Sequence, residues 1–199
     1  MFATVNMTQP TFTVLGTQSF SLEKRYADTF VNGVFKDNIL LTLAYMRGLN
    51  KTSTPNWSDI EKPFTYSITL QPGEVFAFHQ DVLPEFAGKV VKTTNAHFGA
   101  DEGFKSDGYL VADGVCHLAS LINEAATKAG LTVVAPTNHD FAVIPEIPRH
   151  YGTAIYYMPG EKGANAMQNL YVENNKDKPI TIVFDYHNNE LTVNVEEEK

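Results

Sequence analysis

The segment from Gly114 to Gly130 constrains the fold most, because glycines stand at both ends of an amphipathic helix pattern. At 100° per residue, its apolar side chains fall on one stripe about 100° wide. The stripe consists of Leu118, Leu121, Ile122, Ala125 and Ala129. Gly130 suits the position after a helix, where the left-handed backbone conformation is common. We therefore expect a helix at 114–129 that buries this stripe, followed by a β-branched strand at 131–134.

The rest of the 199-residue chain predicts a single α+β domain. Its 43% hydrophobic and 12% aromatic residues are enough to bury a core. A second helix is expected at 36–47, where apolar residues recur at helical spacing before a glycine. Strands are expected at 11–15, 89–94 and 152–158, in a hairpin of 64–70 with 75–79, and in a terminal trio at 168–173, 179–185 and 190–195. These elements predict a largely antiparallel sheet packed against two main helices, with the Cys-bearing helix central and a β-rich C-terminus.

The ends of the chain set the expected domain limits. Residues 1–18 are expected to form an N-terminal extension or a leading strand, and residues 19–195 a single domain. The acidic run at 196–199 is expected to be a frayed tail. A tight turn is expected at 187–189, because Asn tolerates positive φ. The first residues lack a basic region followed by an apolar run, so no signal peptide is visible.

Composition excludes several classes of function. The net charge is −8 and there is no Lys/Arg cluster, which argues against nucleic-acid or anionic-membrane binding through a basic patch. The single cysteine excludes an intrachain disulfide framework and a zinc site built from several cysteines. No run of 18 apolar residues exists, so no membrane span is expected. The acidic residues at 101–107 lack EF-hand spacing, and we expect a solvated loop there. Neither a cofactor nor a metal is predicted.

The cysteine of the expected helix is the candidate nucleophile. Cys116 falls in the first turn and off the apolar stripe, where the helix dipole favours an anion, so a lowered thiol pKa is expected. His139 is the candidate base, because the strand after the helix can bring it back toward the helix N-terminus. Asn138 and Asp140 flank it as candidate supporting residues, and His117 is a second candidate base. The alternative is an inert cysteine in a tight turn and a structural histidine.

Further side chains are candidates for contact with a ligand. Ser120 shares the helix face of Cys116, and Tyr109 and Tyr156 are aromatic residues near this segment. Trp57 lies in the polar loop 50–63, where it either stacks on a ligand or pins the loop to the body of the protein. His117 and Asn138 can serve in binding as well as in catalysis.

Ordered blocks from about residue 19 onward carry a family resemblance. They are DNILLTLAYMRG (37–48), LQPGEVFAFHQDVLP (70–84), DGVCHLASLINEAATKAGLTVV (113–134), TNHDFAV (137–143), YGTAIYY (151–157) and the closing strands at 169–195. They resemble the VanW-like family, named after an accessory protein of vancomycin-resistance clusters. The second block is similar to the family's Leu-x-Pro-Gly-Glu-x-Phe-Ser-Phe-Asn stretch. The third is similar to its Gly-Gly-Gly-Ile-Cys-Gln segment, and the fourth to its His-Ser-x-x-Val motif.

The chain departs from the family pattern at three places. The glycines before the cysteine are reduced to Asp-Gly-Val at 113–115, and the following Gln is His117. The family's Gly-x-Asp-Ala block reads Gly-Thr-Ala at 152–154. The order Cys, His, Asp resembles that of transglutaminase-like and papain-like thiol enzymes, and Thr153 would then be the third residue. Threonine can orient an imidazole but cannot stabilise an imidazolium ion as a carboxylate does.

The resemblance implies a cell-envelope setting outside the cytoplasm. The preferred interpretation is a non-catalytic VanW-like domain that recognises peptidoglycan or a surface peptide. The alternative is a thiol-dependent amide hydrolase or acyl transferase, with Cys116 as nucleophile, His139 as base and backbone N–H groups near Cys116 as oxyanion donors.

Overall fold

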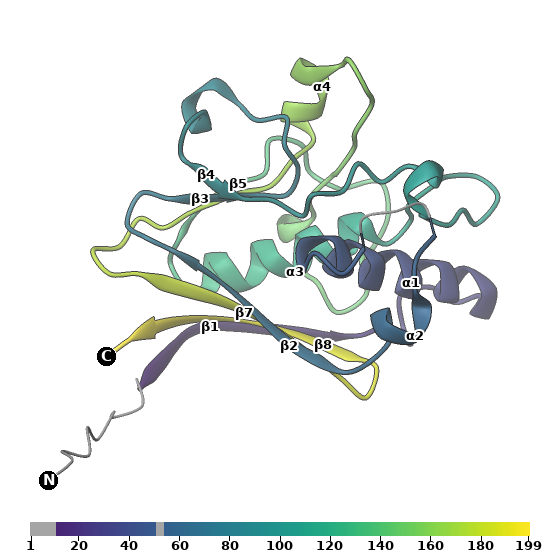
Figure 1. The fold of residues 1–199 in the computed structure, drawn as a ribbon, viewed down its shortest axis with the longest axis horizontal. Coiled ribbons are helices and arrows are strands. Elements are labelled where there is room, and N and C mark those ends of the chain that lie inside the picture. The colour runs from purple at the N-terminus through teal and green to yellow at the C-terminus, as the bar shows by residue number, and fades with distance from the viewer. Residues whose placement is uncertain (1–10, 51–53) are drawn as a thin grey trace, which may run out of the picture.

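The computed structural model describes residues 11–50 and 54–199 (Figure 1). The helices are α1 (Thr29–Met46), α2 (Trp57–Ile60), α3 (Val115–Lys128) and α4 (Lys162–Met167). The strands are β1 (Phe12–Ser21), β2 (Phe64–Leu70), β3 (Val75–Ala77), β4 (Val90–Lys92), β5 (Thr132–Val134), β6 (Tyr171–Glu173), β7 (Ile180–His187) and β8 (Glu190–Glu198). Short 3-10 turns lie at Pro84–Phe86, Ala100–Glu102 and Arg149–Tyr151. The predicted α+β class, with two main helices and a β-rich C-terminus, is confirmed.

The first sheet has the strand order β1-β8-β7-β2, and each neighbouring pair is antiparallel. Side chains alternate between its two faces, as the period of a strand requires. In β7 the buried positions are Ile180, Ile182, Phe184 and Tyr186. The turn to β8 uses Asn188 and Asn189, whose φ angles are 52° and 60°. The predicted tight turn is therefore confirmed.

The second sheet has the order β4-β3-β6-β5, with β3 and β4 parallel and the other pairs antiparallel. The predicted hairpin of 64–70 with 75–79 is wrong, because β2 pairs with β7 and β3 pairs with β6. The QPGE turn between these strands leads from one sheet to the other and does not fold back.

The segment 152–158, predicted as a strand, has no strand among its described residues. Its backbone is extended but makes single hydrogen bonds to different neighbours. The Ala154 N–H donates to the Thr137 carbonyl at 3.0 Å, and the Tyr156 N–H donates to the Gln168 carbonyl at 3.1 Å. The strand prediction is therefore wrong, and only residues 152–154 are buried, whereas Tyr156 and Met158 are exposed.

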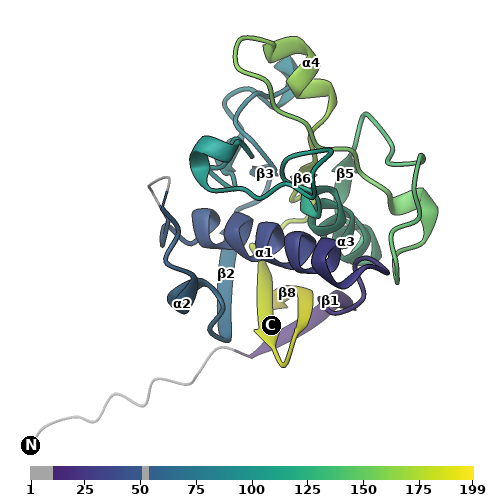
Figure 2. The same cartoon turned by 90° about the vertical axis from the view of Figure 1, so that its right-hand side faces the viewer.

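The helices α1 and α3 lie next to each other, with the first sheet on one side and the second on the other (Figures 1 and 2). α3 contacts β1 and β8 of the first sheet, β5 of the second, and α1. β1 passes close to α3 at Gly16, where a Cβ atom would lie 2.4 Å from the carbonyl oxygen of Ala125. Only a glycine lets the strand pass so near the helix. The predicted central position of the Cys-bearing helix is thereby confirmed.

The ends of two elements differ from the prediction. α1 begins at Thr29 and not at 36, because Asp28 caps it by accepting a hydrogen bond from the Val31 N–H at 3.0 Å. β8 runs to Glu198, which pairs with Phe12 of β1, so the acidic run is part of the sheet and not a frayed tail. β1 extends across the expected boundary at 18/19.

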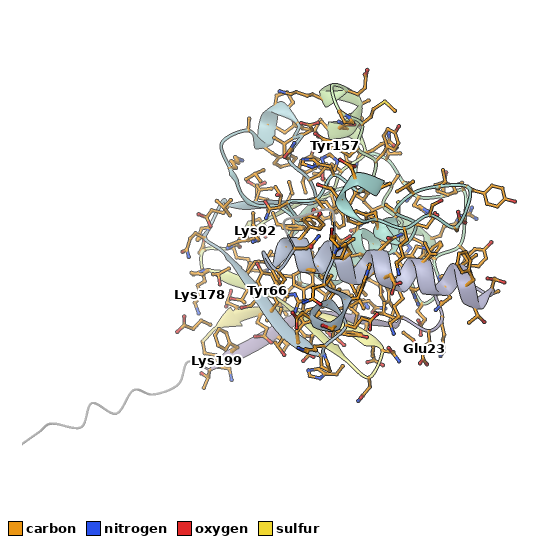
Figure 3. The ribbon with its side chains drawn as sticks, turned by 45° about the vertical axis from the view of Figure 1, so that its right-hand side comes forward. Glu23, Tyr66, Lys92, Tyr157, Lys178 and Lys199 are labelled. Atoms are coloured by element: carbon orange, nitrogen blue, oxygen red, sulfur yellow. The ribbon has the colours of Figure 1, made fainter. Side chains whose placement is uncertain are left out.

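The end of α1 links the two sheets. The carbonyl oxygen of Met46 accepts hydrogen bonds from Lys92 of β4 at 2.9 Å and from the Tyr66 hydroxyl of β2 at 3.1 Å. The Lys92 ammonium also lies 5.7 Å from the centre of the Tyr66 ring, and Figure 3 labels both side chains. A cation near a helix C-terminus is favoured by the helix dipole. This contact holds both sheets to one end of α1.

Candidate functional site

The start of α3 is fixed against α1. Gly114 has a φ of 99°, and a Cβ atom there would lie 2.6 Å from the carbonyl oxygen of Phe35. Both facts require a glycine. Cys116 and His117 follow directly, and the His117 ring lies 4.9 Å from the Phe35 ring. The predicted nucleophile and the second candidate base are therefore held at the junction of the two main helices.

A cleft of about 570 Å³ lies at this end of α3. That volume falls within the range of about 300–1,000 Å³ typical of ligand pockets. Cys116, His117 and His139 all line it. Its rim carries exposed apolar and aromatic side chains, namely Tyr26, Leu110, Val111, Phe141, Val143 and Tyr156. Exposed apolar groups gathered around one hollow are typical of a binding surface.

The thiol of Cys116 is held by the backbone of Ile155. The Ile155 N–H donates to Sγ at 3.4 Å, and Sγ lies 3.7 Å from the Ile155 carbonyl oxygen. The residue as a whole keeps some exposure, but its thiol is surrounded by protein. Burial raises the thiol pKa to about 11. The expected lowering of this pKa is therefore wrong, because desolvation of the thiolate outweighs the helix dipole.

His117 and His139 form a pair of buried imidazoles. Their exposed fractions are 5% and 6%, and their ring centres lie 6.2 Å apart with the ring planes nearly perpendicular. Burial, with Arg25 and His139 nearby, lowers the pKa of His117 to about 3, and burial also lowers the pKa of His139. Both rings are therefore neutral at pH 7. Within the described chain, the Nδ1 atom of neither ring has a hydrogen-bond partner.

The chain does bring His139 back to the start of α3, as expected, but not onto the thiol. In the part of the chain that the structure describes, no hydrogen bond joins Cys116 to His139. The His139 ring instead packs against Phe141 at 4.0 Å. The two residues thus share one cleft without forming a nucleophile–base contact.

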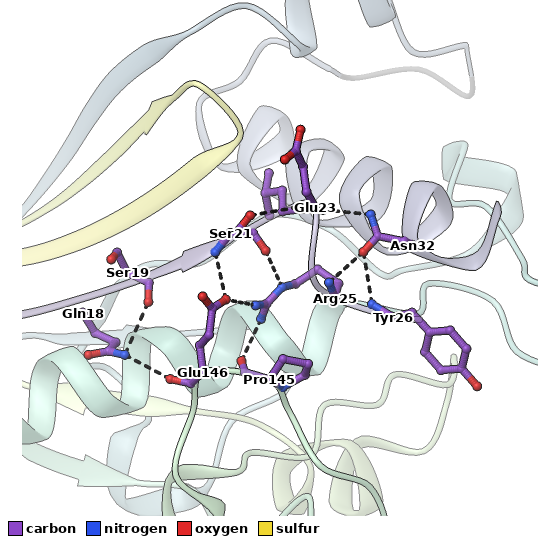
Figure 4. A network of polar contacts seen from close by, with 10 residues as sticks. Gln18, Ser19, Ser21, Glu23, Arg25, Tyr26, Asn32, Pro145 and Glu146 are labelled. Atoms are coloured by element: carbon purple, nitrogen blue, oxygen red, sulfur yellow. Dashed lines mark hydrogen bonds and ion pairs between the residues drawn. The ribbon is translucent and has the colours of Figure 1, made fainter. Parts of the chain in front are cut away.

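The loop that carries His139 is fastened by a buried arginine, shown in Figure 4. The Arg25 guanidinium donates to the Ser21 carbonyl at 2.8 Å, to the Pro145 carbonyl at 3.1 Å and to the Glu146 carboxylate. Burial lowers the Arg25 pKa to about 10 and Glu146 opposes this, so the arginine stays charged. The contact ties the loop 138–147 to the β1–α1 connection. Sequence reasoning missed Arg25, because an isolated arginine between two elements gives no pattern.

Ser120 and Thr153, both predicted site residues, are used in structural hydrogen bonds. The Ser120 hydroxyl donates to the Cys116 carbonyl at 2.7 Å and accepts from the Thr153 N–H at 2.9 Å. The Thr153 hydroxyl accepts from Asn123 at 3.1 Å. Both side chains are fully buried. They hold the segment 151–155 against α3, and among the described residues neither side chain hydrogen-bonds to the His139 ring.

The other predicted contact residues lie around the cleft or away from it. Tyr156 lines the cleft. Tyr109 is 93% exposed and does not line it, although its neighbour Leu110 does. Asn138 and Asp140 are exposed; the first donates weakly to the Arg149 carbonyl at 3.5 Å, and the backbone carbonyl of the second accepts from Arg149.

Trp57 begins α2, on a different part of the molecule. It packs against the core, with the Lys105 ammonium 4.3 Å from its ring centre. This placement agrees with the pinning alternative.

Two carboxyl groups that sequence reasoning did not select also line the cleft. Asp107 accepts from the backbone N–H groups of Tyr109 at 2.8 Å and Leu110 at 3.2 Å. Asp113 interacts directly with Asp107, and burial together with that neighbour raises the Asp113 pKa to about 6. Its Oδ2 atom is buried and, among the described residues, has no donor. The signal that could have found the pair is the two Asp-Gly turns at 107–108 and 113–114.

The fold and the site define an α+β domain with an apolar cleft at the N-terminus of its central helix. The chain belongs to the family described as VanW-like protein, which matches residues 65–196, more than half of its length. The match includes α3, β7 and most of β8, while the resembling block at 37–48 lies outside it. No curated protein and no solved structure matches the chain. Over the residues described, no helix has the length and apolar character needed to cross a membrane.

Proposed function

We propose that this chain is a non-catalytic binding domain of the bacterial cell envelope, acting outside the cytoplasm, which recognises a peptide of peptidoglycan or of the cell surface. The observation that carries the proposal is the cleft of about 570 Å³ with two buried imidazoles whose Nδ1 atoms lack partners. Buried polar atoms without partners are uncommon and call for an explanation. A ligand that hydrogen-bonds to these Nδ1 atoms would explain why they lack partners within the chain.

The state of the thiol argues against the alternative of thiol catalysis. With a pKa of about 11, roughly one Cys116 in 10,000 is a thiolate at pH 7. The neutral His139 makes no described contact with Sγ that would accept its proton. The third position, Thr153, has its hydroxyl engaged by Asn123. A thiol nucleophile needs an ionised sulfur or an adjacent base, and neither condition is supported here.

The family and the surface of the cleft support a peptide of the cell envelope as the ligand. Membership of the VanW-like family suggests an association with the envelope. The rim combines aromatic rings with aliphatic side chains, and such rims suit the side chains of a peptide. Tyr26 and Tyr156 are 54% and 43% exposed, and a tyrosine combines an apolar ring with a hydroxyl that can hydrogen-bond.

The test is a titration of the ¹⁵N-labelled chain with a soluble disaccharide-peptide fragment of peptidoglycan. We expect saturable shifts of amide signals at 107–117 and 139–143. Leu110 lines the cleft and is 62% exposed, while Leu49 is 57% exposed elsewhere. Leu110→Arg should weaken binding about tenfold, a loss of about 1.4 kcal/mol, and Leu49→Arg should not change it.

Two results would contradict the proposal. One is the absence of any saturable shift in the cleft with peptidoglycan fragments and with surface peptides alike. The other is release of a cleaved or transferred product that disappears in a Cys116→Ala variant, which would establish the thiol enzyme instead.

A further inference from the structure

Three buried polar atoms without partners belong to residues that line the cleft, and each can accept a hydrogen bond when the imidazoles carry their proton on Nε2. They are Oδ2 of Asp113 and Nδ1 of His117 and of His139. A carboxylate only accepts hydrogen bonds, and a neutral imidazole has one accepting nitrogen. The two histidines are each more than nine-tenths buried, so bulk water does not replace the missing donor. A ligand that satisfies this cleft must bring donors.

The charges around the cleft are mainly negative. Asp107 and Asp113 interact directly, and the turn that carries Asp107 is closed by a bridge between Ser106 and Val111. Arg25 is the one Lys or Arg among the described residues that line the cleft. Three of its five N–H donors are taken by two carbonyl groups and by Glu146. The chain as a whole has a net charge of −8. A cation is therefore favoured over an anion.

The chemistry of the donors distinguishes an organic cation from a metal ion. Within residues 11–50 and 54–199, no three His, Cys, Asp or Glu side chains come together as a metal site. An ammonium group has three donors and needs no fixed coordination geometry. The apolar and aromatic walls, including Phe35, Val115 and Ile155, suit the methylene stem that carries such a group.

We propose that the ligand inserts a primary ammonium group on an aliphatic stem into the cleft, where the Asp107–Asp113 pair binds it and the two imidazoles accept further hydrogen bonds. This inference rests on the proposed function and names the chemical group by which the peptide is recognised. In an envelope peptide, such a group is the side chain of lysine or of another diamino acid. The stem packs on the apolar walls while the charge is neutralised by the carboxyl pair.

The experiment compares two synthetic peptides, Ala-γ-D-Glu-Lys-D-Ala and the same peptide with an Nε-acetylated lysine, in NMR titrations of the full chain. Acetylation removes the charge and two donors but keeps the stem. We expect the free amine to bind at least about tenfold more tightly. Asp113→Asn should reduce its affinity to that of the acetylated peptide. Asp101→Asn, a change at an exposed aspartate outside the cleft, should leave it unchanged.

The outcomes separate this inference from the proposed function. Equal affinity of the wild-type chain for both peptides would overturn the ammonium site while leaving peptide binding intact. No cleft shift with either peptide, nor with the peptidoglycan fragment, would overturn both. The comparison of the two peptides does not depend on a variant, so misfolding of Asp113→Asn cannot hide a negative result. An all-L, α-linked Ala-Glu-Lys-Ala peptide identifies the source: weaker binding points to peptidoglycan, and equal binding to a surface protein.

Discussion

The thiol of Cys116 allows the sharpest test of the site. Its pKa rises from 9.0 to about 11 because burial disfavours the thiolate. At about pH 8 the folded chain should therefore hold about a hundredfold less thiolate than the unfolded chain. Since the thiolate is the nucleophile, alkylation by iodoacetamide should be about a hundredfold slower in the native protein than in urea. Mass spectrometry over a range of pH values measures the midpoint directly.

The same shift predicts how stability depends on pH. The unfolded chain loses the thiol proton near 9.0, while the folded chain keeps it until about 11. Between these values the unfolded state binds fewer protons, so the free energy of unfolding falls as pH rises. Two pKa units correspond to about 2.7 kcal/mol of stability, which is fully present below pH 9 and lost above pH 11. Urea unfolding of the wild-type chain and of Cys116→Ala isolates this difference from other titrating groups.

Two results would refute the reasoning. An alkylation midpoint at or below 9.0, the value for the unfolded chain, would mean that burial does not suppress the thiolate. A His139→Ala variant whose midpoint rises would mean that the imidazole stabilises the thiolate. Either result would favour the thiol enzyme over the binding domain.

Three further predictions concern the walls of the cleft. Phe141→Ala should weaken peptide binding about fivefold in NMR titrations, because its ring packs on His139 at 4.0 Å, whereas Phe30→Ala, also at an exposed phenylalanine but outside the cleft, should not. Gly114→Ala should lower the free energy of unfolding by about 2 kcal/mol or more, because the added Cβ would clash with Phe35 and the φ angle is positive. Gly33→Ala, whose Cβ would meet nothing within 4 Å, should raise the free energy of unfolding by about 0.5 kcal/mol. Arg25→Met removes three hydrogen bonds and should cost about 3 kcal/mol in urea unfolding, with faster amide exchange in the loop 138–147; unchanged exchange there would contradict its fastening role.

Local patterns in the sequence predicted the elements in which apolar residues recur at the period of a strand or of a helix. The alternation at 180–186 and the Asn pair at 188–189 gave the terminal hairpin, and the apolar stripe gave α3. Patterns of this kind describe one element at a time. They could not show that β2 pairs with β7, more than 100 residues away, or that β3 enters another sheet. The start of α1 was missed because residues 29–33 are partly exposed, although the Asp28 cap was there to be read.

The site was predicted in position more than in chemistry. Helical geometry correctly placed Cys116 off the apolar stripe, and its neighbourhood with His139 was anticipated. The face opposite the stripe is nevertheless covered, because the segment 151–157 packs across it and Ile155 binds the sulfur. Periodicity reports which side of a helix is apolar, but it cannot report that a second segment buries the polar side as well. The carboxyl pair was missed because residues 101–107 were interpreted as a solvated loop, whereas a local turn closed by the Ser106–Val111 bridge brings 107 and 113 together.

The limits of the family match have a practical consequence for the design of truncated fragments. Residues 65–196 leave out β1 and α1, yet Phe35 of α1 and Arg25 and Tyr26 of the β1–α1 connection form part of the cleft wall. A fragment that begins at residue 65 would leave β8 as an unpaired edge strand and strip one side of α3. The stretch that defines the family is therefore shorter than the unit that must fold.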